Sequence, residues 1–171
     1  AGNQNNLITA KKLEMAVKDS DSNIEKILDL GFVGEPISIN SSFINDHIVK
    51  GIIPVIAPLG RDEKGNTYNI NADTAAGAIA GALRASKLIL LTDIAGILDE
   101  NKKLISSLNY EEAKKIISKN FILGGMKPKI TTCIKAISQG VKQATILDGR
   151  IPHALILELF TEHGIGTQIY T

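Results

Sequence analysis

Short apolar runs alternate along the chain with segments in which apolar residues recur every three or four positions. The runs 87–92 and 144–147 are mainly apolar, which is typical of strands buried on both faces of a sheet. Strands that alternate with helices predict an α/β fold, here a three-layer αβα sandwich with a mainly parallel central sheet. The expected strands are 7–10, 31–40, 52–59, 87–92, 144–147 and 167–170, and the expected helices are 43–48, 72–84, 110–119, 127–139 and 154–161.

Composition narrows the possible partners. The 19 Lys and Arg residues nearly balance the 18 Asp and Glu residues, which argues against a strongly basic face for nucleic acid. The single cysteine, Cys133, excludes an intramolecular disulfide and is interpreted as a small buried hydrophobic residue. Since no apolar run reaches the ~18 residues that a membrane span requires, we expect neither nucleic acid nor a membrane as a partner.

Polar clusters follow the expected strands at 69–73, 92–93 and 148–150. Ligands of open α/β sheets bind beyond the carboxyl ends of the strands, so these clusters are candidate site residues. Asn69 and Asn71 offer uncharged donors and acceptors that suit a carboxylate or an amide. The alternative is structural: Asn71 or Asp73 caps a helix, and Asp93 is a turn residue.

A glycine pair, Gly124-Gly125, precedes a helix that has Pro128 in its first turn. Glycines at a helix start let backbone amides face an anion, and Lys129 is placed to hold its ammonium over the same anion. The alternative is a surface lysine on an ordinary helix. The three histidines lack metal-ligand spacing, so we expect no metal site built from protein side chains. These features favour phosphoryl transfer, which depends on positioning and charge neutralisation.

Six stretches together resemble the carboxyl-terminal part of the N-acetyl-L-glutamate kinases of the amino acid kinase family. They are GFVGEPISIN (31–40), IPVIAPLG (53–60), YNINADTAAGAIAGAL (68–83), KLILLTDIAGILD (87–99), GGMKPKI (124–130) and ILDGRIPHALILELFTEHGIGTQI (146–169). The resemblance implies ATP-dependent phosphorylation of the γ-carboxylate of N-acetyl-L-glutamate in arginine biosynthesis. It also implies Mg²⁺ held mainly by phosphates and water, a homo-oligomer (dimer or hexamer), and a cytoplasmic location, or an organellar one in a eukaryote.

The resemblance assigns roles to individual residues. Lys129 resembles the lysine that stabilises the transferring phosphoryl group, and Asp73 resembles the aspartate that organises the catalytic lysines. Residues 1–50 would end the substrate lobe and its hairpin, and residues 51–171 would form the ATP-binding lobe. The remaining implied contacts are Asn69 and Asn71 with the substrate, and Thr92, Asp93, Gly125 and Met126 with the nucleotide.

The tail 158–167 resembles the corresponding stretch of arginine-inhibited members. By this resemblance Glu158 binds the guanidinium of the inhibitor L-arginine, and Gly164 shapes the pocket. Thr145 stands where some arginine-sensitive members have a histidine. The alternative is that Glu158 is a solvated helix residue.

The chain also departs from the family pattern. The family's amino-terminal lobe carries a lysine-bearing glycine loop, a second glycine-rich loop and a substrate-gripping arginine, and none of them is found in residues 1–171. Gly2-Asn3-Gln4 stands where the family usually has Gly-Lys-Asp. We therefore expect the 171-residue chain to be inactive on its own. Two other interpretations stay open: a module that binds ATP or arginine and only regulates, and another family member such as a carbamate kinase, against which the tail 148–160 argues.

Overall fold

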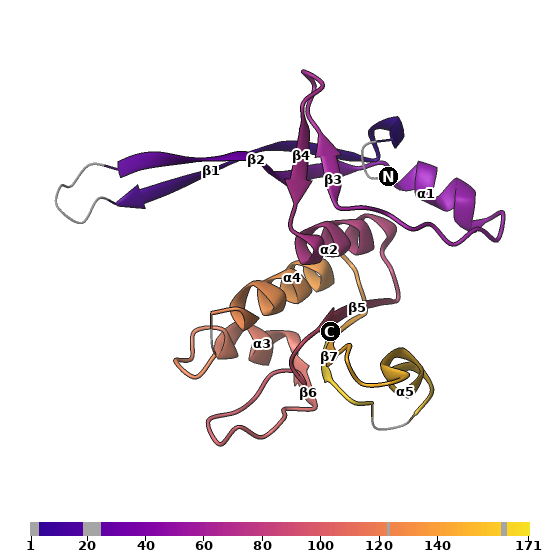
Figure 1. Cartoon of the computed structure of the whole chain (residues 1–171). Helices are drawn as coiled ribbons and strands as arrows, with labels where there is room; N and C mark the ends of the chain where they lie inside the picture. Colours follow the sequence, from indigo (N-terminus) through magenta and orange to yellow (C-terminus); the bar gives the residue numbers. More distant parts are fainter. Residues whose placement is uncertain (1–3, 19–24, 123, 162–163) are drawn as a thin grey trace. The chain divides into compact units, whose positions relative to one another are not determined.

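The computed structural model describes residues 4–18, 25–122, 124–161 and 164–171 (Figure 1). Gly2 and Asn3 therefore lie outside the described residues. The chain divides into two compact units, Ala1–Ile79 (unit 1) and Ala80–Thr171 (unit 2). The helices are a short 3-10 helix, Gln4–Asn6, and α1 Ser41–Ile48, α2 Ala72–Leu83, α3 Tyr110–Ile116, α4 Met126–Ser138 and α5 Ala154–Phe160. The strands are β1 Ile8–Lys18, β2 Glu25–Ile39, β3 Leu59–Arg61, β4 Thr67–Ile70, β5 Lys87–Thr92, β6 Ser107–Asn109, β7 Gln143–Asp148 and β8 Thr167–Tyr170.

Unit 1 is built around a small closed barrel with the strand order β1-β2-β4-β3. The β1–β2 and β3–β4 pairs are antiparallel, whereas β1 pairs with β3, and β2 with β4, in parallel. Alternate residues of β1 and β4 are buried, namely Ile8 and Ala10 on β1 and Tyr68 and Ile70 on β4. Because every second side chain of a strand points to the same face, these four side chains point into the barrel. The barrel interior is therefore the core of the unit.

The barrel is so tight at β3 that only glycine fits at position 60. A Cβ on Gly60 would lie 2.6 Å from Ala10 Cβ and 2.7 Å from Ile70 Cδ1. We therefore expect Gly60→Ala to lower the free energy of unfolding by about 1–3 kcal/mol, as overpacking of a core does. Urea unfolding followed by circular dichroism measures this change. Gly124→Ala is the control, because nothing lies within 4 Å of a Cβ at that position, and equal midpoints for both variants would contradict the expected crowding.

Unit 2 contains a four-stranded sheet with the order β5-β7-β8-β6. The β5–β7 and β6–β8 pairs are parallel and the β7–β8 pair is antiparallel. Helix α4 contacts β5, β7 and β8, while Thr145 on β7 reaches Glu158 of α5. Ala144 and Ile146 point to the face opposite Thr145 and are also fully buried, so both faces of this sheet are covered. This arrangement confirms the expected α/β fold with helix–sheet–helix layers, and the sheet is mixed.

The buried hydroxyl of Thr167 holds the long connection between β5 and β6 against β8. Thr167 is 0% exposed, and its Oγ1 accepts a hydrogen bond from Ile97 N (2.8 Å) and donates one to Ile105 O (2.6 Å). Gly96 has a φ of 148°, and a Cβ there would lie 2.6 Å from Thr167 Oγ1. The close approach therefore requires a glycine, and one side chain fixes both ends of the segment 97–105.

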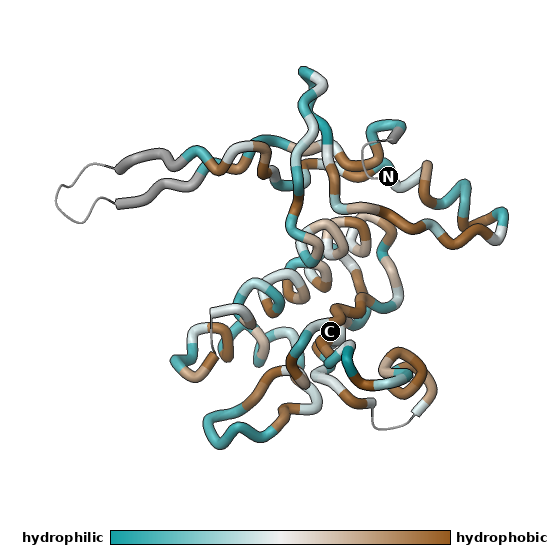
Figure 2. The backbone as a smooth tube through the Cα atoms, viewed as in Figure 1, coloured by the Kyte–Doolittle hydropathy of each residue, from teal (hydrophilic) through white to brown (hydrophobic). Residues whose placement is uncertain are grey.

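The expected strand over 52–59 is wrong for most of its length. Residues 52–57 form no strand, and β3 begins only at Leu59. Ile53 and Val55 are 87% and 90% exposed, and Figure 2 shows this apolar stretch as a brown segment leading away from α1. Apolar residues form a buried strand only beside other strands, and no strand of the described residues pairs with this segment.

The other expected elements are confirmed, with shifted ends. β1 and β2 are longer than the expected 7–10 and 31–40, and the short strands β4 and β6 were not expected. The unit boundary at Ile79/Ala80 follows contacts within the chain, whereas the lobe boundary after residue 50, which concerns function, stays a prediction. Within the described ranges, no helix is both long and apolar enough to span a membrane.

Candidate functional site

The three candidate residues of unit 1 surround the start of α2. Asn69 is exposed near the end of β4, in register with Val33 of β2 and Leu59 of β3. Asn71 is the N-cap of α2: its Oδ1 accepts hydrogen bonds from Thr74 N (3.1 Å) and Thr74 Oγ1 (3.3 Å). The expected alternative of a capping role is thus confirmed for Asn71. Asp73 is half-buried in the first turn, where a carboxylate interacts favourably with the helix dipole.

In unit 2 the glycine pair leads directly into α4. Gly125 is the N-cap residue without any side-chain cap, and a Cβ on Gly124 or Gly125 would have open space around it. Packing among the described residues therefore does not require these glycines, whereas close approach of an anion to the helix start would. Met126 is buried, so its backbone is what it can present to a nucleotide. Lys129 is half-buried in the first turn.

The carboxyl ends of β5 and β7 lie side by side, because Thr92 and Asp148 are register partners in the parallel pair. Arg150 donates to Asp148 through Nε (2.9 Å) and Nη2 (2.8 Å), a two-pronged contact that lowers the pKa of the Asp148 carboxyl to about 2. Asp93 accepts a hydrogen bond from the Thr92 hydroxyl (3.2 Å). Two of the three strand-end clusters of the sequence thus form one polar edge.

Glu158 is a buried carboxylate, only 7% exposed, so the expected alternative of a solvated helix residue is wrong. Its Oε1 accepts a hydrogen bond from Thr145 Oγ1 (3.1 Å), and its Oε2 accepts one from Ile165 N (3.0 Å). Gly164 has a φ of 55°, and a Cβ there would lie 2.6 Å from Glu158 Oε2. The structure therefore brings Glu158, Gly164 and Thr145 together around one carboxylate.

Sequence reasoning missed the cation of this cluster. Lys87 Nζ lies 3.9 Å from Glu158 Oε1, and the Lys87 side chain is 22% exposed. A carboxylate that is buried away from water is stable only if its charge is compensated. The ammonium of Lys87 supplies part of the compensation for Glu158. Lys87 is the first residue of β5, two residues before Ile89, the register partner of Thr145. No local signal in the sequence indicates this pair, because it depends on the register of β5 with β7 and on the place of α5.

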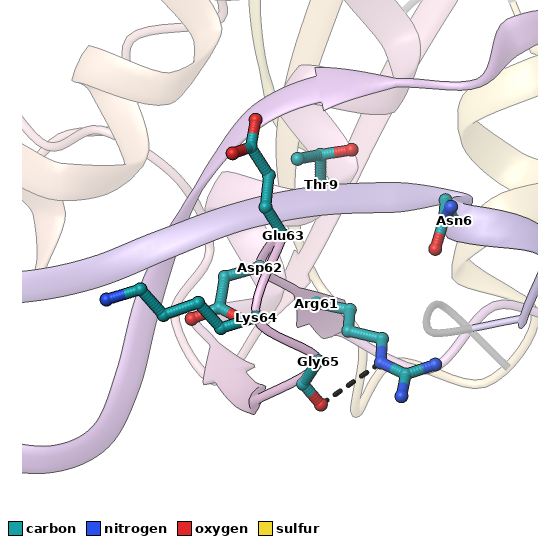
Figure 3. A pocket seen from close by; sticks show the side chains of 7 residues that line it. All are labelled: Asn6, Thr9, Arg61, Asp62, Glu63, Lys64 and Gly65. Atoms are coloured by element: carbon teal, nitrogen blue, oxygen red, sulfur yellow. Dashed lines mark hydrogen bonds between the residues drawn. The ribbon is translucent and has the colours of Figure 1, made fainter.

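A polar cavity of about 330 Å³ lies in unit 1, around the β3–β4 hairpin, and contains none of the candidate residues (Figure 3). Arg61 Nε donates to Gly65 O (3.1 Å), so this guanidinium serves the hairpin itself. Asp62 holds the same turn, accepting from Asn66 N (2.8 Å) and Tyr68 Oη (2.9 Å). The lining residues are Asn6, Thr9, Arg61, Asp62, Glu63, Lys64 and Gly65.

The candidate residues thus form groups within each unit: Asn69, Asn71 and Asp73 in unit 1, and the strand-end edge, the α4 start and the Glu158 cluster in unit 2. Their roles stay predictions. In the described part of the chain, no group of three or more His, Cys, Asp or Glu side chains is arranged to hold a metal ion.

Solved structures share this fold. One is the N-acetylglutamate synthase of Neisseria gonorrhoeae in complex with coenzyme A and L-arginine. The similarity covers 96% of this chain and 36% of the synthase chain, with 28% sequence identity and a TM-score of 0.83. The carbamate kinase of Giardia lamblia bound to AMP-PNP matches 92% of this chain with 52% of its own, at 19% identity and a TM-score of 0.62. The second similarity concerns the fold alone.

Curated relatives are more similar in sequence. The acetylglutamate kinase of Rhodospirillum centenum is 54% identical over 169 residues, which are 99% of this chain and 55% of the relative. That of Afipia carboxidovorans is 53% identical over 170 residues, which are 99% of this chain and 58% of the relative. The chain therefore spans little more than half the length of these relatives. The profile of the family described as "Amino acid kinase family" matches residues 2–148, which are most of the chain. Because of this match and the α/β fold, the chain belongs to the amino acid kinase family.

Proposed function

We propose that the complete gene product is an acetylglutamate kinase of arginine biosynthesis. The observation that carries this proposal is the identity of more than half of the aligned positions to enzymes of that name, over 99% of the chain. ATP is the phosphoryl donor, N-acetyl-L-glutamate is the acceptor, and N-acetyl-L-glutamyl 5-phosphate and ADP are the products. The reported relatives are bacterial, which favours a cytoplasmic location over an organellar one.

The reaction is a direct transfer without a phosphoenzyme. An oxygen of the γ-carboxylate forms a bond to the γ-phosphorus, the bond from that phosphorus to the β–γ bridging oxygen breaks, and ADP leaves with the electron pair. The acceptor is already ionised at neutral pH, so no general base is needed. The protein then has to bring two anions together and offset the charge that builds up between them.

Each candidate residue fits one part of this task. Lys129 and the amides at the start of α4 offset charge on the transferring phosphoryl group. Asn71 uses its Oδ1 to cap α2, which leaves its Nδ2 hydrogens to donate to the acceptor together with Asn69. Asp73 organises the lysines electrostatically. Thr92, Asp93, Gly125 and the backbone of Met126 line the nucleotide site.

Magnesium fits this site only as a ligand of the nucleotide. The described residues offer no cage of three or more metal-binding side chains, whereas Mg²⁺ binds readily to phosphate oxygens and water. In that position it would neutralise phosphate charge, and the roles given above to the side chains do not depend on it.

A second proposal is regulation by L-arginine at Glu158. The buried carboxylate of Glu158, which lies beside Thr145 and close to Gly164, is the kind of group that pairs with a guanidinium. The synthase of Neisseria gonorrhoeae, similar over 96% of this chain, is named as a complex with L-arginine.

We further propose that the complete protein is a homo-oligomer, a dimer or a hexamer. Light scattering with and without arginine would determine its oligomeric state.

The activity is tested on the complete gene product by coupled detection of ADP and by trapping of the acyl phosphate as a hydroxamate. We expect ADP and hydroxamate to form at equal rates with N-acetyl-L-glutamate, and neither to form with carbamate or L-glutamate. A higher rate with carbamate would favour the carbamate kinase alternative. Nucleotide or arginine binding without turnover on any acceptor would favour the regulatory module.

A further inference from the structure

The segment Asp148-Gly149-Arg150 lies at the polar edge of unit 2, and none of its residues has a role in the proposed function so far. Gly149 N donates to Thr92 O (2.8 Å), which joins the turn after β7 to the last residue of β5. A Cβ on Gly149 would lie 3.2 Å from Leu91 Cβ. The turn therefore rests closely against the end of β5, where Thr92 and Asp93 follow.

Arg150 is hydrogen-bonded to Asp148 within its own segment. Both oxygens of the Asp148 carboxylate accept from the guanidinium, at 2.9 Å and 2.8 Å, and Oδ1 also accepts from Arg150 N (2.9 Å). The Asp148 side chain is 13% exposed and that of Arg150 is 68% exposed. The carboxylate thus anchors the guanidinium, and most of the arginine faces solvent beyond the strand ends.

The charges at this edge explain why an arginine is needed there. Asp148 ends β7 and Asp93 directly follows the neighbouring parallel strand β5, so two carboxylates stand where an anionic nucleotide is proposed to bind. Arg150 interacts electrostatically with both of them, and each interaction raises its pKa, that with Asp148 most strongly. Without Arg150 the edge would carry two negative charges, which would repel a polyphosphate.

We propose that Arg150 is a positioning residue for the nucleotide: clamped by Asp148, it offsets the charge of Asp148 and Asp93 at the edge where ATP binds. This inference rests on the proposed use of Thr92 and Asp93 in the nucleotide site. If Arg150 acts in this way, nucleotide affinity depends on the sign of the charge at each position and not on the ion pair itself. The two partners of one ion pair should therefore have opposite effects on nucleotide affinity.

The test is calorimetric titration of the complete gene product with a non-hydrolysable ATP analogue, at low and high ionic strength. For Arg150→Gln we expect the Kd to rise about tenfold at low salt and less at high salt, because added ions screen the exposed charges. Arg150→Lys should keep most of the affinity. Asp148→Asn, which removes a negative charge from the same pair, should leave the Kd unchanged or lower it.

Lys114→Gln is the matched control, because Lys114 pairs with Glu111 (3.3 Å) on the surface of α3 in the same unit. Equal Kd values for Arg150→Gln and Lys114→Gln would overturn the inference. A similar rise in Kd for Arg150→Gln and Asp148→Asn would also overturn it, because the ion pair would then be only structural. A Kd for Arg150→Lys as high as that for Arg150→Gln would overturn it as well. Nucleotide binding is measured without an acceptor, so these outcomes are distinct from failure to phosphorylate N-acetyl-L-glutamate.

Discussion

Replacement of Lys129 by alanine in the complete gene product should lower kcat by roughly 100-fold or more, the typical loss when one preorganised charge is removed from a transition state. Lys129 lies in the first turn of α4, after two glycines whose lack of side chains the described packing does not require. An ammonium at this position adds to the positive end of the helix dipole, and in the proposed site both act on the same phosphoryl group. Steady-state kinetics with saturating ATP and N-acetyl-L-glutamate measure the change.

Lys127→Ala is the control for this experiment. Lys127 lies in the same turn of α4 but is exposed, so it should retain nearly full kcat. Lys129→Arg should recover part of the lost rate, since it keeps the charge but changes its position. If Lys129→Ala and Lys127→Ala had the same kcat, Lys129 would be a surface lysine without a role in transfer.

Replacement of Glu158 by alanine should weaken binding of L-arginine by about 30-fold or more and destabilise the protein by about 3 kcal/mol. Both effects have one cause, because removal of one member of a buried charge pair leaves the other charge without compensation. In the protein that charge is Lys87, 3.9 Å from the carboxylate, and in the proposed arginine complex it would also be the ligand's guanidinium. Calorimetry with arginine and urea unfolding measure the two effects separately.

Glu158→Gln separates charge from shape, because an amide can still accept a hydrogen bond from Thr145 Oγ1 or Ile165 N. We expect it to lose arginine binding while keeping more stability than the alanine variant. Glu111→Ala is the matched control, since it breaks an exposed ion pair with Lys114, and such pairs contribute little. No heat from arginine with the unaltered protein would exclude the regulatory proposal, and unchanged affinity in Glu158→Ala would exclude Glu158 from the pocket.

Local signals predicted most elements of unit 2 well. Continuous apolar runs mark β5 and β7, and helical spacing of apolar residues marks α3, α4 and α5. Both signals depend only on residues that are close together in the sequence. The failure at 52–57 has a different origin. Ile53 and Val55 have the apolar, β-branched character of a buried strand, but whether such a run becomes a strand depends on partners that its own sequence does not contain.

The candidate site shows the same division. The capping role of Asn71 was an expected alternative because it requires only a side chain three residues before Thr74 N. The ion pair of Lys87 with Glu158 joins residues from β5 and α5, and the Asp148–Arg150 pair is electrostatically linked to Asp93, which follows β5. Such long-range arrangements follow from strand order and register, which a pattern of apolar and polar residues leaves open.

The position of β8 has a consequence for synthesis of the chain on the ribosome. β8 is the last strand in sequence order, yet it lies between β7 and β6 in the sheet. The strands β5 and β7 can pair as soon as both have emerged, but β6 has no place beside them until Thr167–Tyr170 follows. Until then the segment 97–105 also lacks the hydroxyl of Thr167. The nascent protein therefore carries an unpaired sheet edge until β8 has been made, and such an edge is prone to aggregation.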